Sequence, residues 1–158
     1  FPRTTWDIFS YTSLSSEAKE AIYPVLRKAI EGKNEATAAN ILINFVQTGF
    51  QYKTDQQQFG YERSLFGDET LFYPYSDCED RFILYSILVR ELLGLDVALV
   101  SYPGHLATAV CFKEGPYGDY FNVDGKKFTV CDPTYIGAHI GLTMPDMDNN
   151  KAELTILQ

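Results

Sequence analysis

Residues 78–93 form an apolar run that constrains the fold more than any other part of the sequence. Large aliphatic and aromatic side chains occur on every side of the helix that this run would form, and not only along one stripe. The following Gly94 is a typical residue for the C-terminus of a helix. We therefore expect a core helix that is buried nearly all round.

Two amphipathic helices are predicted before this core helix. The first covers about residues 16–32, where Pro24 is expected to kink or divide it, and the second covers about residues 35–48 and stops at Gly49. Residues 50–77 show no clean period. A loop of that length in a compact domain is usually functional, unless regular elements there escape the pattern.

After Gly94 the hydrophobic period changes to two, which predicts strands. The strands are expected at residues 97–102, 105–112, 119–123, 127–132 and 154–157. Asp124-Gly125 marks a tight hairpin between the third and fourth strands. Helices followed by an antiparallel sheet predict an α+β fold, in one domain that covers residues 1–158 and is large enough for its own core.

The charge and composition limit the partners of the chain. The net charge is −8 and no basic stripe occurs, so we expect no nucleic-acid partner. No stretch is apolar enough over a sufficient length to predict insertion into a membrane. The chain begins at Phe1 instead of Met, so we expect a processed or excised part of a longer protein with further domains. The compartment stays open, with an extracytoplasmic location (periplasm or cell surface) favoured.

The chain has three cysteines, Cys78, Cys111 and Cys131, without the spacing of a disulfide framework. An odd number indicates at least one free thiol, and the sequence leaves open whether Cys111 and Cys131 pair. No short ligand spacing joins the cysteines and His105, so we expect neither a metal ion nor another cofactor.

Cys78, His105 and Asp132 each lie where an expected element begins or ends. Cys78 opens the core helix, where the helix dipole and the free N–H groups favour a thiolate and where its own N–H can bind an oxyanion. His105 follows a Pro-Gly turn and opens a strand, and Asp132 ends another strand. A thiol, an imidazole and a carboxylate make a nucleophile, its base and the group that orients the base. These residues are the predicted catalytic set.

This prediction requires a particular strand order. His105 begins strand 105–112 and Asp132 ends strand 127–132, so antiparallel pairing of these two strands brings the residues side by side. We therefore expect strand 127–132 to lie between strands 105–112 and 119–123. A simple meander would place the two residues at opposite ends of the sheet.

Other residues near the predicted set are assigned from their positions in the sequence. Glu79 and Asp80 would oppose a thiolate if they faced it, so we expect them to point away, towards Arg81 or Arg63. His139 is a second choice for the imidazole. The candidates for a second oxyanion donor or a substrate contact are Gln58, Tyr73 and Tyr75.

Three phrases of the sequence resemble the transglutaminase-like superfamily, the papain-type fold of transglutaminases, peptide N-glycanases and related bacterial cysteine peptidases. The matching phrases are Ser76-Asp77-Cys78-Glu79-Asp80, Gly104-His105 and Asp132-Pro133-Thr134. They occur in the order of the family, with 27 residues from Cys78 to His105 and 27 more to Asp132. The resemblance covers about residues 40–137.

The resemblance implies a papain-like fold, in which N-terminal helices precede a buried core helix that packs on an antiparallel sheet. It also implies that Cys78 is the nucleophile, His105 the general base and acid, and Asp132 the group that orients His105. Two positions depart from the family pattern. Ala107 replaces a common aromatic residue and Ser76 replaces the usual glycine, which leaves the substrate open.

Two functions are compatible with the sequence. The favoured one is a bacterial cysteine-dependent enzyme for acyl transfer on the amide bonds of a peptide or protein, with hydrolysis (peptidase or amidase) favoured over cross-linking. The alternative is a non-catalytic module that binds peptide or glycan in the same groove. Members of the superfamily that lose activity usually lose a triad residue, so the complete set favours the enzyme.

Overall fold

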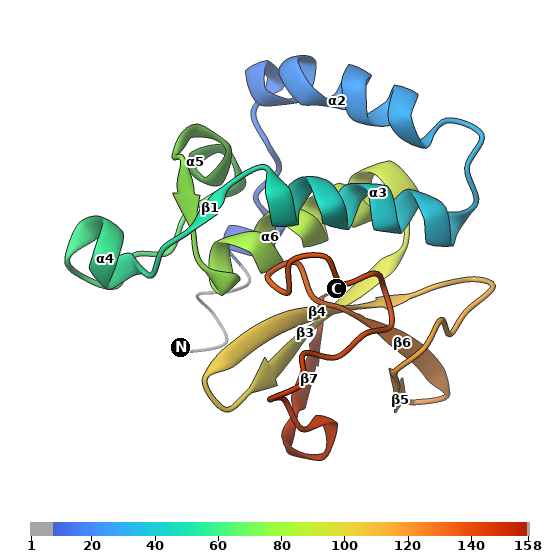
Figure 1. The fold of residues 1–158 in the computed structure, drawn as a ribbon. Coiled ribbons are helices and arrows are strands. Elements are labelled where there is room, and N and C mark those ends of the chain that lie inside the picture. The colour runs from blue at the N-terminus through green and yellow to red at the C-terminus, as the bar shows by residue number, and fades with distance from the viewer. Residues whose placement is uncertain (1–7, 158) are drawn as a thin grey trace.

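In the computed structural model, which describes residues 8–157, the helices lie together on one face of a curled antiparallel sheet (Figure 1). The helices are α2 (Ser16–Ile30), α3 (Glu35–Thr48), α4 (Asp55–Phe59), α5 (Gly67–Phe72) and α6 (Cys78–Leu88). The strands of the sheet are β3 (Asp96–Tyr102), β4 (His105–Cys111), β5 (Tyr120–Val123), β6 (Lys126–Cys131) and β7 (Glu153–Ile156). The predicted α+β class is confirmed.

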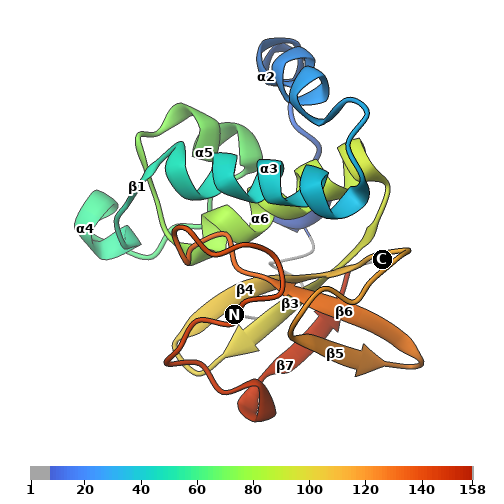
Figure 2. The ribbon, with the colours of Figure 1, turned by 45° about the vertical axis from the view of Figure 1, so that its right-hand side comes forward.

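Helix α6 is the buried core helix that the apolar run predicts. It lies between α3 and the sheet in both views, and it packs against α3, α5 and β4 (Figure 2). Every residue from 79 to 88 is buried. The helix continues as a π-helical turn, η1 (Val89–Leu93), and ends at Gly94, whose φ of 66° is left-handed. The apolar run thus extends through both helical segments.

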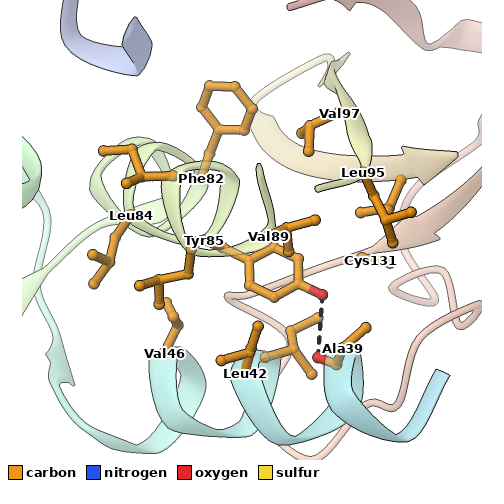
Figure 3. Packing of buried hydrophobic residues seen from close by; sticks show 14 of the residues in the cluster. Ala39, Leu42, Val46, Phe82, Leu84, Tyr85, Val89, Leu95, Val97 and Cys131 are labelled. Carbon is orange, nitrogen blue, oxygen red and sulfur yellow. Dashed lines mark hydrogen bonds between the residues drawn. The ribbon is translucent and has the colours of Figure 1, made fainter. Parts of the chain in front are cut away.

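Side chains on all sides of α6 make the main core. Figure 3 shows Phe82, Leu84 and Tyr85 pointing in different directions from this helix, with Tyr85 directed towards α3. All three are fully buried. Burying one large apolar side chain stabilises a fold by about 1.5–3 kcal/mol. The Tyr85 hydroxyl donates a hydrogen bond to the Ala39 carbonyl oxygen at 3.2 Å, so its polar end is also satisfied.

The two upstream helices occur where their periods predict them. The Ser15 hydroxyl caps α2 and the Asn34 side chain caps α3. The prediction that Pro24 divides the first helix is wrong, because α2 runs through it without interruption. Pro24 is exposed on the side of α2 away from the core, where the helix does not depend on tight packing.

Residues 50–77 contain regular structure that the sequence pattern did not show. Two short helices, α4 and α5, lie between strands β1 (Gln51–Tyr52) and β2 (Tyr75–Ser76), which pair in parallel. The expectation of an irregular segment is therefore wrong. Helices of five or six residues are too short to display a hydrophobic period, and α4 depends instead on a capping box between Thr54 and Gln57.

Main-chain pairing orders the sheet β5–β6–β4–β3–β7, with all neighbours antiparallel. Each strand ends within one residue of its predicted limits. Strand β6 lies between β4 and β5, which confirms the predicted order. Asp124 and Gly125 form the predicted hairpin with φ angles of 52° and 81°, as a type I′ turn requires.

We expect the Leu84→Ala variant to lose about 2–5 kcal/mol of unfolding free energy, because it leaves a cavity around a fully buried side chain. The control is Val25→Ala on α2, where the side chain is 68% exposed and the change should stay within about 0.5 kcal/mol. Urea denaturation followed by circular dichroism measures both variants. Equal losses in the two would contradict the central place of α6 in the core.

Candidate active site

Cys78 is the first residue of α6 and lines an open cleft of about 480 Å³. A reciprocal capping box fixes this end of the helix. The Asp77 carboxylate accepts a hydrogen bond from the Asp80 N–H at 3.1 Å, and the Asp80 carboxylate accepts one from the Asp77 N–H at 3.0 Å. The thiol is therefore held at a helix N-terminus, partly exposed, among N–H groups that have no acceptor within the helix.

His105 is the first residue of β4 and follows the turn at Gly104, whose φ is 78°. Across the β3–β4 hairpin it pairs with Tyr102. The Tyr102 ring stacks on the imidazole with a centroid distance of 6.1 Å and an interplanar angle of 23°. Its hydroxyl donates to the Asn149 side chain at 2.7 Å. The imidazole is thus packed against a ring that is itself fixed by a hydrogen bond.

Asp132 directly follows β6, and hydrogen bonds fix both its carboxylate and its main-chain oxygen. Its Oδ2 lies 2.7 Å from His105 Nε2. Its Oδ1 accepts the backbone N–H groups of Thr134 and Tyr135, at 2.9 and 3.2 Å. The Gln47 amide donates to the Asp132 main-chain oxygen at 3.0 Å. A carboxylate fixed in this way can hold a neighbouring imidazole in one orientation.

The charge of His105 depends on Asp132 and Cys78. Burial by itself would lower the pKa of the imidazole, but hydrogen bonding to Asp132, and next to Cys78, raises it to about 9. Because Nε2 faces Asp132, the opposite ring nitrogen, Nδ1, is the one left for Cys78. The structure thus brings the three predicted residues together as thiol, imidazole and carboxylate, with the imidazole in the middle.

The cleft has an acidic side and an apolar side. Glu62, Asp77 and Glu79 supply carboxylates from the segment before α6 and from its first turn, whereas β3 and β4 supply Leu99 and Leu106. A ligand that reaches the thiol therefore meets carboxylates on one side and aliphatic groups on the other.

The expectation that Glu79 points away from the thiol is wrong, whereas Asp80 does not line the cleft and its carboxylate accepts the Asp77 N–H. Glu79 lines the cleft with Cys78, and Arg63 forms its ion pair with Glu69. Burial, and next the charge of Asp77, raises the pKa of Glu79 to about 8 and that of Asp80 to about 9. The sequence could not show this, because burial of the first turn depends on contacts with distant segments.

The three candidates for a second donor lie outside the cleft. Gln58 is on α4, where its Oε1 is buried without a hydrogen-bond partner. The Tyr73 hydroxyl accepts a hydrogen bond from the Arg63 guanidinium at 3.4 Å. The Tyr75 ring lies 3.7 Å from the Lys53 amino group. None of these three side chains is among the residues that line the cleft.

Tyr52 is a residue near the thiol that the sequence did not single out. Burial, followed by the charges of Cys78 and Asp77, raises the pKa of its phenol. The Arg81 guanidinium lies 5.6 Å from its ring centroid. No local pattern marks Tyr52, because the parallel pairing of β1 with β2 is what brings it beside the start of α6.

The remaining histidine and cysteines lie apart from the cleft. His139 Nδ1 is hydrogen bonded to the Ile140 main-chain oxygen at 2.7 Å, and His139 lines a separate small cavity with Gln47. Cys111 and Cys131 are both free, so they do not pair with each other. The structure thus leaves His105 as the histidine that faces Cys78.

Three carboxylates beside Cys78 could hold a metal ion. Asp55, Asp77 and Glu79, here called the carboxylate cluster, each offer an oxygen, and these oxygens all lie within 4.8 Å of one another. Sequence spacing alone did not indicate this group. Asp55 belongs to α4, and the fold brings it to residues more than twenty positions later in the chain.

The chain matches no protein-family model and no curated protein. Within residues 8–157, every helix is too short or too polar to cross a membrane.

We expect the imidazole of His105 to titrate near pH 9, because the folded protein binds this proton more tightly than the unfolded chain does. The stability that this proton provides is complete below about pH 6.5, the ordinary histidine pKa, and is lost as the pH rises through about 9. NMR titration of the ring, assigned with a His139→Gln variant, measures the pKa. In Asp132→Asn the pKa should fall, and an unchanged value would contradict the role given to Asp132.

Proposed function

We propose that the protein is a cysteine-dependent enzyme that attacks amide carbonyls, forms an acyl-thioester and transfers the acyl group. The observation that carries this proposal is the imidazole of His105, which lies 2.7 Å from the Asp132 carboxylate and interacts with Cys78 in an open cleft. A nucleophile, a base and an orienting carboxylate in this arrangement are the parts that covalent catalysis needs.

We further propose that the chain has the papain-type fold of the transglutaminase-like superfamily. Support comes from the buried helix that begins with Cys78 and packs on an antiparallel sheet. His105 and Asp132 then occur, in that order, at one end of two paired strands of this sheet. The three motif phrases of the sequence fall at these same element boundaries.

We assign each group a role in the proposed reaction. The Cys78 sulfur attacks the carbonyl carbon, and the N–H of Cys78 at the helix N-terminus is placed to stabilise the oxyanion. His105, protonated at neutral pH, gives its proton to the leaving amine as the C–N bond breaks. The same imidazole then takes a proton from the acceptor that attacks the thioester, while Asp132 keeps the ring oriented.

Water is the acceptor that we favour, which makes the enzyme a peptidase or amidase acting on a peptide or protein. Transfer to an amine would use the same acyl-enzyme and would cross-link instead of hydrolyse. A non-catalytic binding module would be expected to have a filled cleft or a triad out of reach. The open cleft and the interactions of His105 with both Asp132 and Cys78 support the enzyme.

We expect iodoacetamide to alkylate Cys78 at pH 6 at least about tenfold faster than Cys111, because the imidazole of His105 interacts with Cys78 and can accept its proton. Cys111 is an internal control, since it is also free and partly exposed. In His105→Ala the Cys78 rate should fall to that of Cys111. Peptide mass spectrometry after timed quenching measures both sites in one sample. Equal rates in the unmodified protein would contradict a working thiol–imidazole pair.

Activity on a panel of peptide amides should depend on the same residues. We expect Cys78→Ala to lower kcat/KM by at least about 10³-fold, because the acyl-enzyme can no longer form. Cys111→Ser, which changes a thiol outside the cleft, should retain activity. Products formed with and without an added primary amine, identified by mass spectrometry, distinguish hydrolysis from transfer. Activity that survives in Cys78→Ala would refute the proposal.

A further inference from the structure

The three residues of the candidate active site come from two different layers of the fold. Cys78 begins α6, whereas His105 begins a strand of the sheet and Asp132 directly follows another. The chemistry proposed above needs the thiol and the imidazole at one fixed separation, so the two layers have to be joined firmly. Residues 47–50, at the C-terminal end of α3, are hydrogen bonded to both layers.

The side chain of Gln47 is buried and forms three hydrogen bonds to the loop after β6. It is 1% exposed. Its Nε2 donates to the main-chain oxygens of Asp132 and Ala138, at 3.0 Å each, and its Oε1 accepts the Gly137 N–H at 3.2 Å. A primary amide offers two donors and an acceptor on one planar group, which matches these three partners. In both ribbon views the chain after β6 returns beside α3 (Figures 1 and 2).

Gln47 holds Asp132 just beyond the paired part of the sheet. The register between β4 and β6 ends at Cys131, one residue before Asp132. Beyond it, the Asp132 main-chain oxygen accepts from Gln47, and the carboxylate Oδ1 accepts two N–H groups of the following loop. Gln47 also binds the far part of that loop. With Oδ1 held in this way, Oδ2 is left for His105 Nε2, which lies 2.7 Å away.

The same end of α3 also holds α6. The Arg81 guanidinium, which follows Cys78 by three residues, belongs to a fully buried side chain. It donates to the main-chain oxygens of Gln47 and Phe50, at 3.5 and 3.1 Å, and to the Ser76 hydroxyl at 2.9 Å. None of the ion pairs among residues 8–157 includes Arg81, so these hydrogen bonds hold its guanidinium. The start of α6 is therefore anchored to the helix end that binds the loop after β6.

We infer that Gln47 is a positioning residue, whose side chain fixes Asp132 and whose main-chain oxygen joins this loop to α6. The inference rests on the acyl-transfer function proposed above, because it concerns the same three reacting residues. Loss of the amide would release the Asp132 main chain and leave two buried carbonyl oxygens without this donor. The carboxylate would then hold the imidazole of His105 less closely, although all the reacting groups would still be present.

A purely structural role for Gln47 predicts a different result. The amide would then stabilise the loop after β6, and its loss would lower the unfolding temperature without any change at His105. Asn40 provides the matched control. It lies about two turns earlier on α3, and its side-chain oxygen accepts the Ile140 N–H at 2.8 Å. This hydrogen bond ties down the same loop at the end that is far from Asp132.

The test compares Gln47→Met with Asn40→Leu, each of which replaces an amide by an apolar side chain of similar size. Both are made in the Cys78→Ala protein, so that Asp132 is the remaining one of the two residues that raise the pKa of His105. In NMR titrations we expect this pKa to fall by at least about half a pH unit in Gln47→Met, because the hydrogen bond to Asp132 is weakened. In Asn40→Leu it should not change. The measurement involves no turnover, so it does not depend on the proposed activity.

With Cys78 present, turnover of the peptide amides gives a second result. Gln47→Met should lower kcat by about tenfold to a hundredfold and change KM by less than about twofold, because the imidazole is displaced while the cleft keeps its lining. Asn40→Leu should keep its kcat. Each variant is assayed well below its own unfolding temperature. An inactive unmodified protein would refute the acyl-transfer function alone, and the NMR titration would still decide the role of Gln47.

An unchanged pKa of His105 in Gln47→Met would overturn the inference, and so would an equal fall in Asn40→Leu. If Gln47→Met does not fold, Gln47→Glu keeps the size of the side chain and the acceptor for Gly137 but lacks the two donors of the amide, so the same fall is expected. Hydrogen exchange of the Gln47 Nε2 protons provides a test without any variant. They should exchange at least about a hundredfold more slowly than those of the exposed Gln56, and equal rates would also overturn the inference.

Discussion

The burial of α6 on all sides is the constraint on which the rest of the structure depends. Because α3 and α5 cover the helix on one side and the sheet covers it on the other, its position is fixed along its whole length. The capping box at Asp77 then sets where the helix starts, and so where Cys78 stands. The thiol of Cys78 is thus placed by the buried helix that it begins.

The cleft separates two kinds of charge. On the sheet side, His105 and Asp132 form a pair in which a positive ring is neutralised by a buried carboxylate. On the helix side, none of the ion pairs among residues 8–157 includes a member of the carboxylate cluster. Cys78 lies between the two sides. This asymmetry explains why burial raises the pKa of Glu79 strongly, while hydrogen bonds determine the pKa of His105.

The sequence predicted the elements that follow a clear hydrophobic period, and failed where contacts between distant residues decide. The core helix could be predicted from its long apolar run, and the five strands from the change of the hydrophobic period to two. The β4–β6 pairing could be predicted because the catalytic set requires His105 and Asp132 to lie side by side. Residues 50–77 could not, because α4 and α5 are too short for a period and are defined by caps. For a related reason, the orientation of Glu79 was predicted wrongly and the position of Tyr52 near Cys78 was not predicted. Their surroundings come from that same segment.

The register between β4 and β6 has a consequence for how the chain can vary. Paired main-chain hydrogen bonds, such as those that align Thr108 with Cys131, fix the spacing of His105 and Asp132. The connection between β4 and β5, residues 112–119, does not set that spacing. Insertions or deletions there would leave the pair intact, whereas one residue added inside either strand would turn one partner to the opposite face of the sheet. A longer connection is therefore compatible with the pair, whereas a residue inserted into β4 or β6 is not.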